Sequence, residues 1–148
     1  MKRLLHRAIA EGLNFSFETT LGGSTIASLL MKATTMEIDV NIWYVGLVSP
    51  ELHIARVRSR VARGGHDIPE ERIRKRYYRS ISNLIELMPK LNELRVYDNS
   101  TEADPHAGIR PQPLLILHVI QRRIVETCQL ERTPKWAKPI VMSAFRPM

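Results

Sequence analysis

An apolar run followed at once by a strong helix start constrains the fold more than any other feature of this sequence. Residues 38–48 are rich in the β-branched and aromatic side chains that sheets favour. Ser49, Pro50 and Glu51 then supply a capping hydroxyl, a proline whose missing N–H costs nothing in the first turn, and an acid at the positive end of the helix dipole. A strand leading directly into a helix is typical of an α/β protein.

The remaining apolar periodicity predicts more helices and short strands in alternation. Gly12 stands where the first helix should stop, and Asp67 with Glu70 resembles a capping box that starts the helix running to Met88. A loop is expected over 101–113. The expected helices are 4–12, 26–33, 50–63, 67–88, 120–128 and 134–146, and the expected strands are 15–18, 38–48, 94–97 and 114–119.

Strands separated by helices predict one α/β domain over 1–148, with a mostly parallel sheet and flanking helices. In such sheets a ligand binds beyond the carboxyl ends of the strands. Glu18, Val48–Ser49 and Asp98–Asn99 follow three expected strands, so we expect them to lie on one rim of the sheet.

Most of the positive charge lies in one stretch of the chain. The formal net charge is +7, and nine basic residues against three acids between Arg56 and Arg79 account for +6 of it. Guanidinium groups offer paired donors that suit phosphate oxygens, so this stretch indicates a phosphate-bearing partner, whether a nucleotide, RNA or DNA. A solvated basic helix face is the alternative interpretation.

Other sequence features bear on the compartment. The longest apolar runs are far shorter than the ~20 residues that a membrane helix needs. Charged residues interrupt the first sixteen residues, unlike a signal peptide, and the single cysteine, Cys128, allows no internal disulfide. We therefore expect a cytoplasmic protein without membrane association.

Three segments together carry a resemblance to a known family. Phe17-Glu18-Thr19-Thr20-Leu21, the stretch from Arg63 to Pro69, and Tyr97-Asp98-Asn99-Ser100 resemble the zeta-toxin-like P-loop kinases, including proteins described as predicted ABC-type ATPases. The closing Pro134-Lys135-Trp136-Ala137-Lys138-Pro139-Ile140 is also similar. The resemblance implies a nucleoside-kinase-like P-loop fold with an Arg-rich helical lid, and an ATP-dependent phosphotransferase that acts on a small molecule or UDP-sugar with ATP and Mg²⁺.

The resemblance also implies roles for particular residues. Glu18 and Thr20 match substrate-binding positions, and Arg63 and Arg76 match lid arginines that neutralise the transferring phosphate. Asn99 lies in the segment that borders the adenine of the cofactor, and no metal ligand is assigned. Each residue also has an ordinary structural interpretation: a surface acid, a helix-end arginine, or turn chemistry at Asp98–Ser100.

One part of the family pattern is missing. A phosphate-binding loop of the form GxxxxGK[ST] needs a Gly-Lys pair, and this sequence contains none. In the family that loop precedes the segment that opens this chain, so we expect a truncated and catalytically incomplete member. Loss of a central strand would leave unpaired sheet edges, so we expect marginal stability or self-association.

Two other function classes remain open. A small basic protein could bind nucleic acid through Arg56 to Arg79, although this stretch lacks the interleaved aromatic residues that stack on bases. The chain could instead be an inactive interaction protein with a partner similar to an antitoxin. Salt dependence of nucleic-acid affinity distinguishes the first alternative from a small-molecule kinase.

Overall fold

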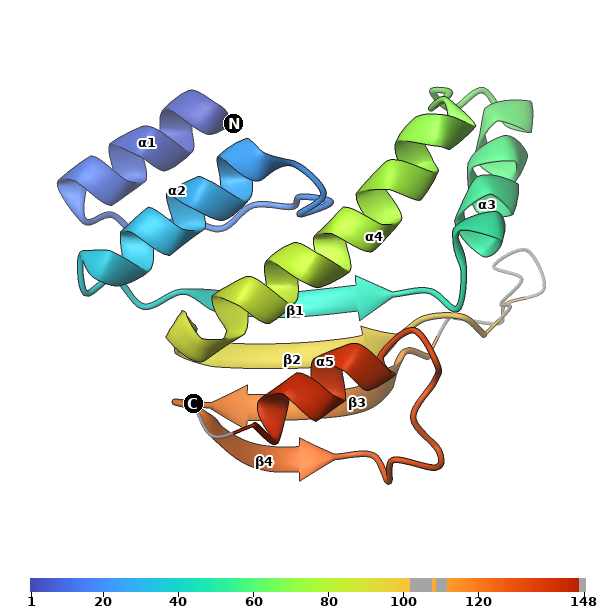
Figure 1. Cartoon of the computed structure of the whole chain (residues 1–148). Coiled ribbons are helices and arrows are strands. Elements are labelled where there is room, and N and C mark those ends of the chain that lie inside the picture. The colour runs from blue at the N-terminus through green and yellow to red at the C-terminus, as the bar shows by residue number, and fades with distance from the viewer. Residues whose placement is uncertain (102–107, 109–111, 147–148) are drawn as a thin grey trace.

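The computed structural model of the chain describes residues 1–101, 108 and 112–146. These residues form a four-stranded sheet with the strand order β1-β2-β3-β4. The helices α4 and α5 lie across one face of this sheet, and α1 and α2 lie beyond its β1 edge (Figure 1). The elements are α1 (Lys2–Glu11), α2 (Ser24–Thr35), β1 (Asn41–Gly46), α3 (Pro50–Ala62), α4 (Glu70–Leu87), the 3₁₀ helix η1 (Met88–Lys90), β2 (Glu93–Asp98), β3 (Leu114–Ile120), β4 (Arg123–Thr127) and α5 (Lys138–Ala144).

The expectation of a mostly parallel sheet, and with it the P-loop kinase fold, is wrong. Only β1 and β2 pair in parallel, with Asn41 opposite Glu93 and Gly46 opposite Asp98. The pairs β2–β3 and β3–β4 are antiparallel. The helices α3 and α4 form a crossover long enough to return the chain in the same direction, whereas no helix is described between β2 and β3 or between β3 and β4.

The second error in the fold prediction lies at residues 120–128, which form a strand instead of the expected helix. Ile120 pairs with Arg123, so β3 and β4 are joined by a two-residue turn. Gln121 and Arg122, the turn residues, have φ angles of 46° and 67°. Two positive φ values define the type I′ turn, which matches the twist of a hairpin and usually contains Asn or Gly. Neither residue type is present, so the sequence lacked the usual hairpin signal.

Several local predictions are confirmed. Gly12 ends α1 in the left-handed conformation, with φ 63°. The Ser49 Oγ accepts a hydrogen bond of 3.1 Å from the backbone N–H of Leu52, with Pro50 in the first turn of α3. The expected strand 114–119 is β3, and the strand expected over 38–48 is the shorter β1.

Other local predictions fail. Pro69, not Asp67, caps α4, and the Asp67 carboxylate instead accepts from the N–H of Ile68. The expected strand 15–18 forms no regular element, and the helix expected over 134–146 is confined to α5. The loop expected over 101–113 lies largely outside the described residues.

The main core lies between the sheet and the helices. Its fully buried members include Leu84 and Leu87 of α4, Val96 of β2, Ile116 of β3 and Ile140 of α5. α3 does not contribute to this core. A second, smaller cluster joins Ile54 and Val57 of α3 to Ile73 of α4. α3 and the first half of α4 therefore form a hairpin with a core of its own. Along the described residues, no helix combines the length and apolar character needed to cross a membrane.

Candidate functional site

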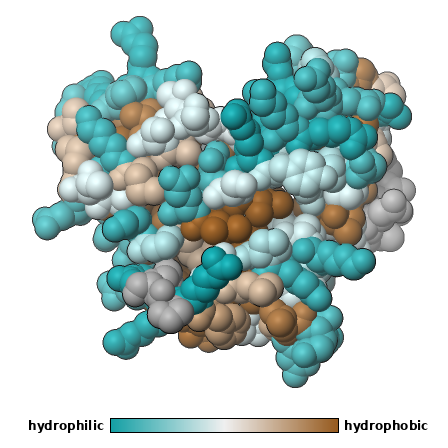
Figure 2. Space-filling view, viewed as in Figure 1, coloured by the Kyte–Doolittle hydropathy of each residue, from teal (hydrophilic) through white to brown (hydrophobic). Residues whose placement is uncertain are grey.

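A cleft of about 1350 Å³ opens between the stretch of residues 13–20 and β1. The molecular surface is hollowed between the α1–α2 side and the α3–α4 hairpin, and mostly hydrophilic side chains cover the hairpin (Figure 2). Residues from 13–21, β1, α3 and α4 line the cleft. It therefore brings together four parts of the chain that are distant in sequence.

One mouth of the cleft lies at the carboxyl ends of β1 and β2. The backbone N–H of Asn99 donates to the Gly46 carbonyl at 2.9 Å, and the N–H of Val48 donates to the Ser100 Oγ at 2.7 Å. The Ser100 hydroxyl and N–H both donate to the Asp98 carboxylate, which is therefore engaged in turn chemistry. The predicted rim thus exists for β1 and β2, and Asn99 lines the cleft beside it.

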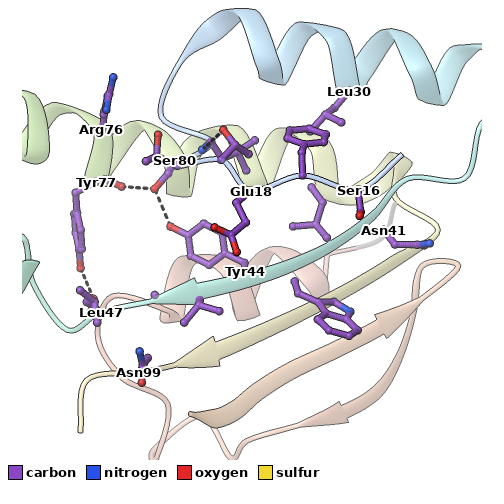
Figure 3. Close-up of a pocket in the computed structure, with 18 of the residues that line it drawn as sticks. Ser16, Glu18, Leu30, Asn41, Tyr44, Leu47, Arg76, Tyr77, Ser80 and Asn99 are labelled. Carbon is purple, nitrogen blue, oxygen red and sulfur yellow. Dashed lines mark hydrogen bonds between the residues drawn. The ribbon is translucent and has the colours of Figure 1, made fainter. Parts of the chain in front are cut away.

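Glu18 and Thr20 lie on the opposite wall, on the segment that precedes α2. Glu18 points from this segment toward β1 (Figure 3). The segment is fixed to α4 just after these residues. The amide of Asn83 donates to the Leu21 carbonyl at 2.7 Å, and Gly22 passes so close to α4 that an added Cβ would lie 2.7 Å from the Cβ of Arg76. Only glycine allows such a close approach without displacing either the segment or α4.

One face of α3 presents three basic side chains to the cleft. His53, Arg56 and Arg60 line it, and their spacing of three and four residues places them on one side of the helix. Burial, together with the charges of Arg60 and Arg56, lowers the pKa of the His53 imidazole. The positive character of this mouth therefore comes from Arg56 and Arg60, while His53 is the residue whose pKa responds to burial and to these two charges.

The two predicted lid arginines differ in position. Arg76 lines the cleft, but its side chain extends from α4 away from β1, toward the outer rim (Figure 3). Arg63 is not among the lining residues. It caps α3, and its guanidinium donates to the carbonyl and hydroxyl of Ser59 at 3.1 and 3.0 Å. The structure therefore brings Glu18, Thr20, Arg76 and Asn99 to one cleft and leaves Arg63 outside it.

A chain of hydroxyl groups crosses the cleft wall. The Ser80 hydroxyl donates to the Tyr77 carbonyl at 2.8 Å, so its oxygen accepts from the Tyr44 hydroxyl, also at 2.8 Å (Figure 3). The Tyr77 hydroxyl donates to the Leu47 carbonyl at 2.9 Å. Burial raises the pKa of Tyr44, and burial with nearby negative groups raises the pKa of Tyr77 to about 12. Both phenols remain neutral at physiological pH, and they position α4 against β1.

Trp136 closes the cleft at the Gly46 end. Its ring lies so close to Gly46 that an added Cβ would be 2.2 Å from a ring carbon. The indole is 7% exposed, and its Nε1 is buried with no hydrogen-bond partner among the described residues. A buried donor without an acceptor is costly, so the apolar packing of this ring must offset the unmet hydrogen bond.

The residue types present suit phosphate better than a metal. Within the described ranges, no group of three His, Cys, Asp or Glu side chains could hold a metal ion. The Mg²⁺ that the kinase resemblance implies therefore stays an expectation, and we derive no step through it. The arginine and histidine side chains that line the cleft are donors, which bind anionic oxygens.

Some lining residues were missed from the sequence. Arg56 and Arg60 entered only as part of a basic stretch, and His53 did not enter at all. Their helical spacing was a usable signal, because 53, 56 and 60 share one face once Ser49 is taken as the cap. Tyr44, Tyr77 and Trp136 carried no local signal, because their roles depend on contacts between distant segments.

Comparison with known proteins does not show a family for this chain. No protein-family profile matches the chain, and no solved structure matches it significantly. An uncharacterized protein of Haemophilus influenzae is 35% identical over 74 residues, which is 50% of this chain and 53% of that protein. The chain thus spans about half the length of this curated relative, whose description adds no activity.

Proposed function

We propose that the cleft binds a phosphate-bearing small molecule of the nucleotide or nucleotide-sugar class. The observation that carries this proposal is the placement of His53, Arg56 and Arg60 on one face of α3, lining the same mouth as Asn99. Guanidinium groups bind phosphate oxygens through paired, charge-assisted hydrogen bonds. Glu18 lines the same cleft from the opposite wall, where it points toward β1 and its carboxylate can accept from sugar hydroxyl groups (Figure 3).

We further propose that this binding belongs to an ATP-dependent phosphotransferase acting in the cytoplasm, one that shares sequence segments with zeta-toxin-like kinases but not their mostly parallel sheet. The matching segments around Glu18, Arg63 and Asn99 support this class. Because the sequence has no Gly-Lys pair, we expect the chain to bind its substrate without turning over ATP. Arg76 at the rim and Arg60 in the mouth are the side chains placed to neutralise phosphate charge.

Calorimetry with UDP-N-acetylglucosamine and with ATP tests the proposal. Arg56→Gln and Arg60→Gln each remove a guanidinium from the mouth, and we expect each to weaken binding by about tenfold to hundredfold, the range for a hydrogen bond to a charged group. Arg63→Gln is the matched control, because it removes the same charge from the same helix outside the cleft. Equal effects of all three changes would show that net charge alone determines affinity.

The His53 imidazole supplies a second readout that needs no variant. Nearby Arg60 and Arg56 charges contribute to its lowered pKa. A bound phosphate compensates these charges, so the pKa of His53 should rise on ligand addition, which an NMR titration detects. No change at a saturating ligand concentration would contradict binding at this mouth.

Nucleic acid is the second candidate, favoured by the exposed Arg72, Lys75 and Arg79 on α4. Two other arginines of the hairpin are already paired, Arg58 with Glu70 and Arg74 with Glu51. Binding of RNA through the hairpin would weaken steeply as the salt concentration rises. Arg79→Gln would reduce the RNA affinity, whereas Arg56→Gln would have little effect on it. The opposite pattern supports the small-molecule cleft.

A further inference from the structure

The outer edge of β1 offers unpaired backbone groups to the cleft. In a parallel pair, alternate residues direct both their N–H and C=O groups toward the neighbouring strand. The carbonyls of Val40 and Gly46 accept from β2-side amides, which places the even-numbered residues on the β2 side. Asn41, Trp43 and Val45 therefore direct their backbone groups at the cleft.

The backbone of residues 14–20, on the opposite wall of the cleft, also lacks hydrogen-bond partners within the described part of the chain. Residues 14–20 form no helix or strand, and their backbone N–H and C=O groups make no hydrogen bond within the described part of the chain. Ser16 and Glu18 face β1 from this wall (Figure 3). A small ligand at the mouth would leave the stretch between Asn41 and Val45 empty, whereas an extended peptide can pair along it.

The charges along the cleft are separated by sign. Asp39 lines it at the amino end of β1, where the neighbouring Glu93 carboxylate is already paired with Arg95, and Arg56 and Arg60 line it near the carboxyl end. Between them, the six residues of β1 carry no charged side chain. A strand lying parallel to β1 would therefore be matched by a basic amino end and an acidic carboxyl end.

We propose that this cleft accepts one strand of another polypeptide, parallel to β1, with a basic residue at its amino end and an acidic residue at its carboxyl end. Main-chain pairing to a free edge is a common mode of peptide recognition. The opposite edge of the sheet differs, because β4 is short and carries Arg123 and Glu126, which discourage pairing. β1 has no such protection besides the cleft itself.

A second copy of this chain does not fit the cleft as well as an isolated strand does. The β1 strand of a second copy is flanked by β2 on one edge and faces residues 13–20 across its own cleft on the other. The occupant needs both edges free, because both walls present unpaired backbone. This inference does not depend on the proposed function, because phosphate binding is measured at the mouth and peptide pairing along β1.

Amide hydrogen exchange followed by NMR tests the proposal. The probe is the blocked peptide Lys-Val-Thr-Val-Thr-Val-Asp, and the matched control is the same composition reversed, Asp-Val-Thr-Val-Thr-Val-Lys. At saturating probe we expect exchange of the Asn41, Trp43 and Val45 amides to slow by about tenfold or more, with little change at Ile42 and Tyr44, which already bond to β2. The reversed peptide should bind at least about fivefold more weakly.

Two variants distinguish backbone pairing of the peptide with β1 from nonspecific binding of the peptide. Trp43→Pro removes the outward N–H at an edge position where proline is tolerated, and it should abolish the protection. Trp43→Thr removes the same exposed side chain but keeps the N–H, and it should retain the protection. Absence of protection by the Lys-first peptide, or stronger protection by the reversed peptide, overturns the proposal, as does protection that rises with protein concentration without peptide, which would identify a second copy as the occupant.

Discussion

Replacing Gly22 by alanine tests whether the close approach of the 18–22 segment to α4 positions the cleft. The added Cβ would lie 2.7 Å from the Cβ, 2.8 Å from the Cγ and 2.9 Å from the Cα of Arg76. A rotamer change can move the Cγ, but the Cβ and Cα are fixed by the helix. The segment must therefore move away from α4, and the hydrogen bond from Asn83 to the Leu21 carbonyl must lengthen.

The net cost follows from two opposing effects. Overpacking typically costs about 1–3 kcal/mol, and the reduced freedom of the unfolded chain on replacing glycine by alanine returns about 0.4–1 kcal/mol. We expect Gly22→Ala to lower the free energy of unfolding by about 1–2 kcal/mol, seen as a lower urea midpoint with an unchanged m-value. For a chain of this length that corresponds to a fall in melting temperature of about 2–8 °C.

Gly23→Ser is the matched control for this substitution. It adds a Cβ at the next residue, where nothing lies within 4 Å, and serine is favoured at the N-cap position that Gly23 occupies. We expect this variant to be as stable as the wild type or slightly more stable. Equal stability of both variants would refute the reasoning that contact with Arg76 fixes the segment.

Three further changes test other contacts. Gly46→Ala should lower the stability by about 1–3 kcal/mol and alter Trp fluorescence, because the new Cβ would overlap the Trp136 ring; replacing Trp136 by leucine in the same chain should reduce the loss. Hydrogen bonds, the strongest from His118, lower the pKa of Glu93, so the carboxylate stabilises the fold above its ordinary pKa of about 4.3 and this stability disappears as pH falls through the folded-state value. In urea unfolding, Glu93→Gln should thus have a lower free energy of unfolding than the wild type at pH 7 and the same free energy at low pH. A difference between the two proteins that does not vary with pH would contradict this. Ser49→Ala should cost about 0.5–2 kcal/mol through the lost cap of α3, whereas Ser49→Asp should retain most of the stability.

The predictable parts of the fold were those determined by local chemistry. Ser49 with Pro50 starts α3, and Gly12 ends α1, because caps and left-handed turns depend on one or two residues. The β1–β2 rim could be placed because a helical crossover between them implies parallel strands. The strand β4 could not, because Gln121 and Arg122 form a hairpin turn without the residues that usually mark one.

The site was predicted to a similar extent. Among the residues to which the resemblance assigned roles, Glu18, Thr20, Arg76 and Asn99 line one cleft, whereas Arg63 lies outside it because its side chain turns back onto Ser59; their roles stay predictions. The expected strand at 15–18 has the alternation of a strand but no neighbour to pair with. Pairing partners are a property of the whole fold, which local alternation does not contain.

The separate small core of the α3–α4 hairpin divides the basic groups of the cleft into two sets. Arg76 lies on α4, whose second half is anchored in the main core through Leu84 and Leu87. The arginines of α3 are held mainly by Ile54 and Val57 against Ile73. A tilt of α3 would therefore change the distance between the α3 arginines and Arg76 without exposing the main core.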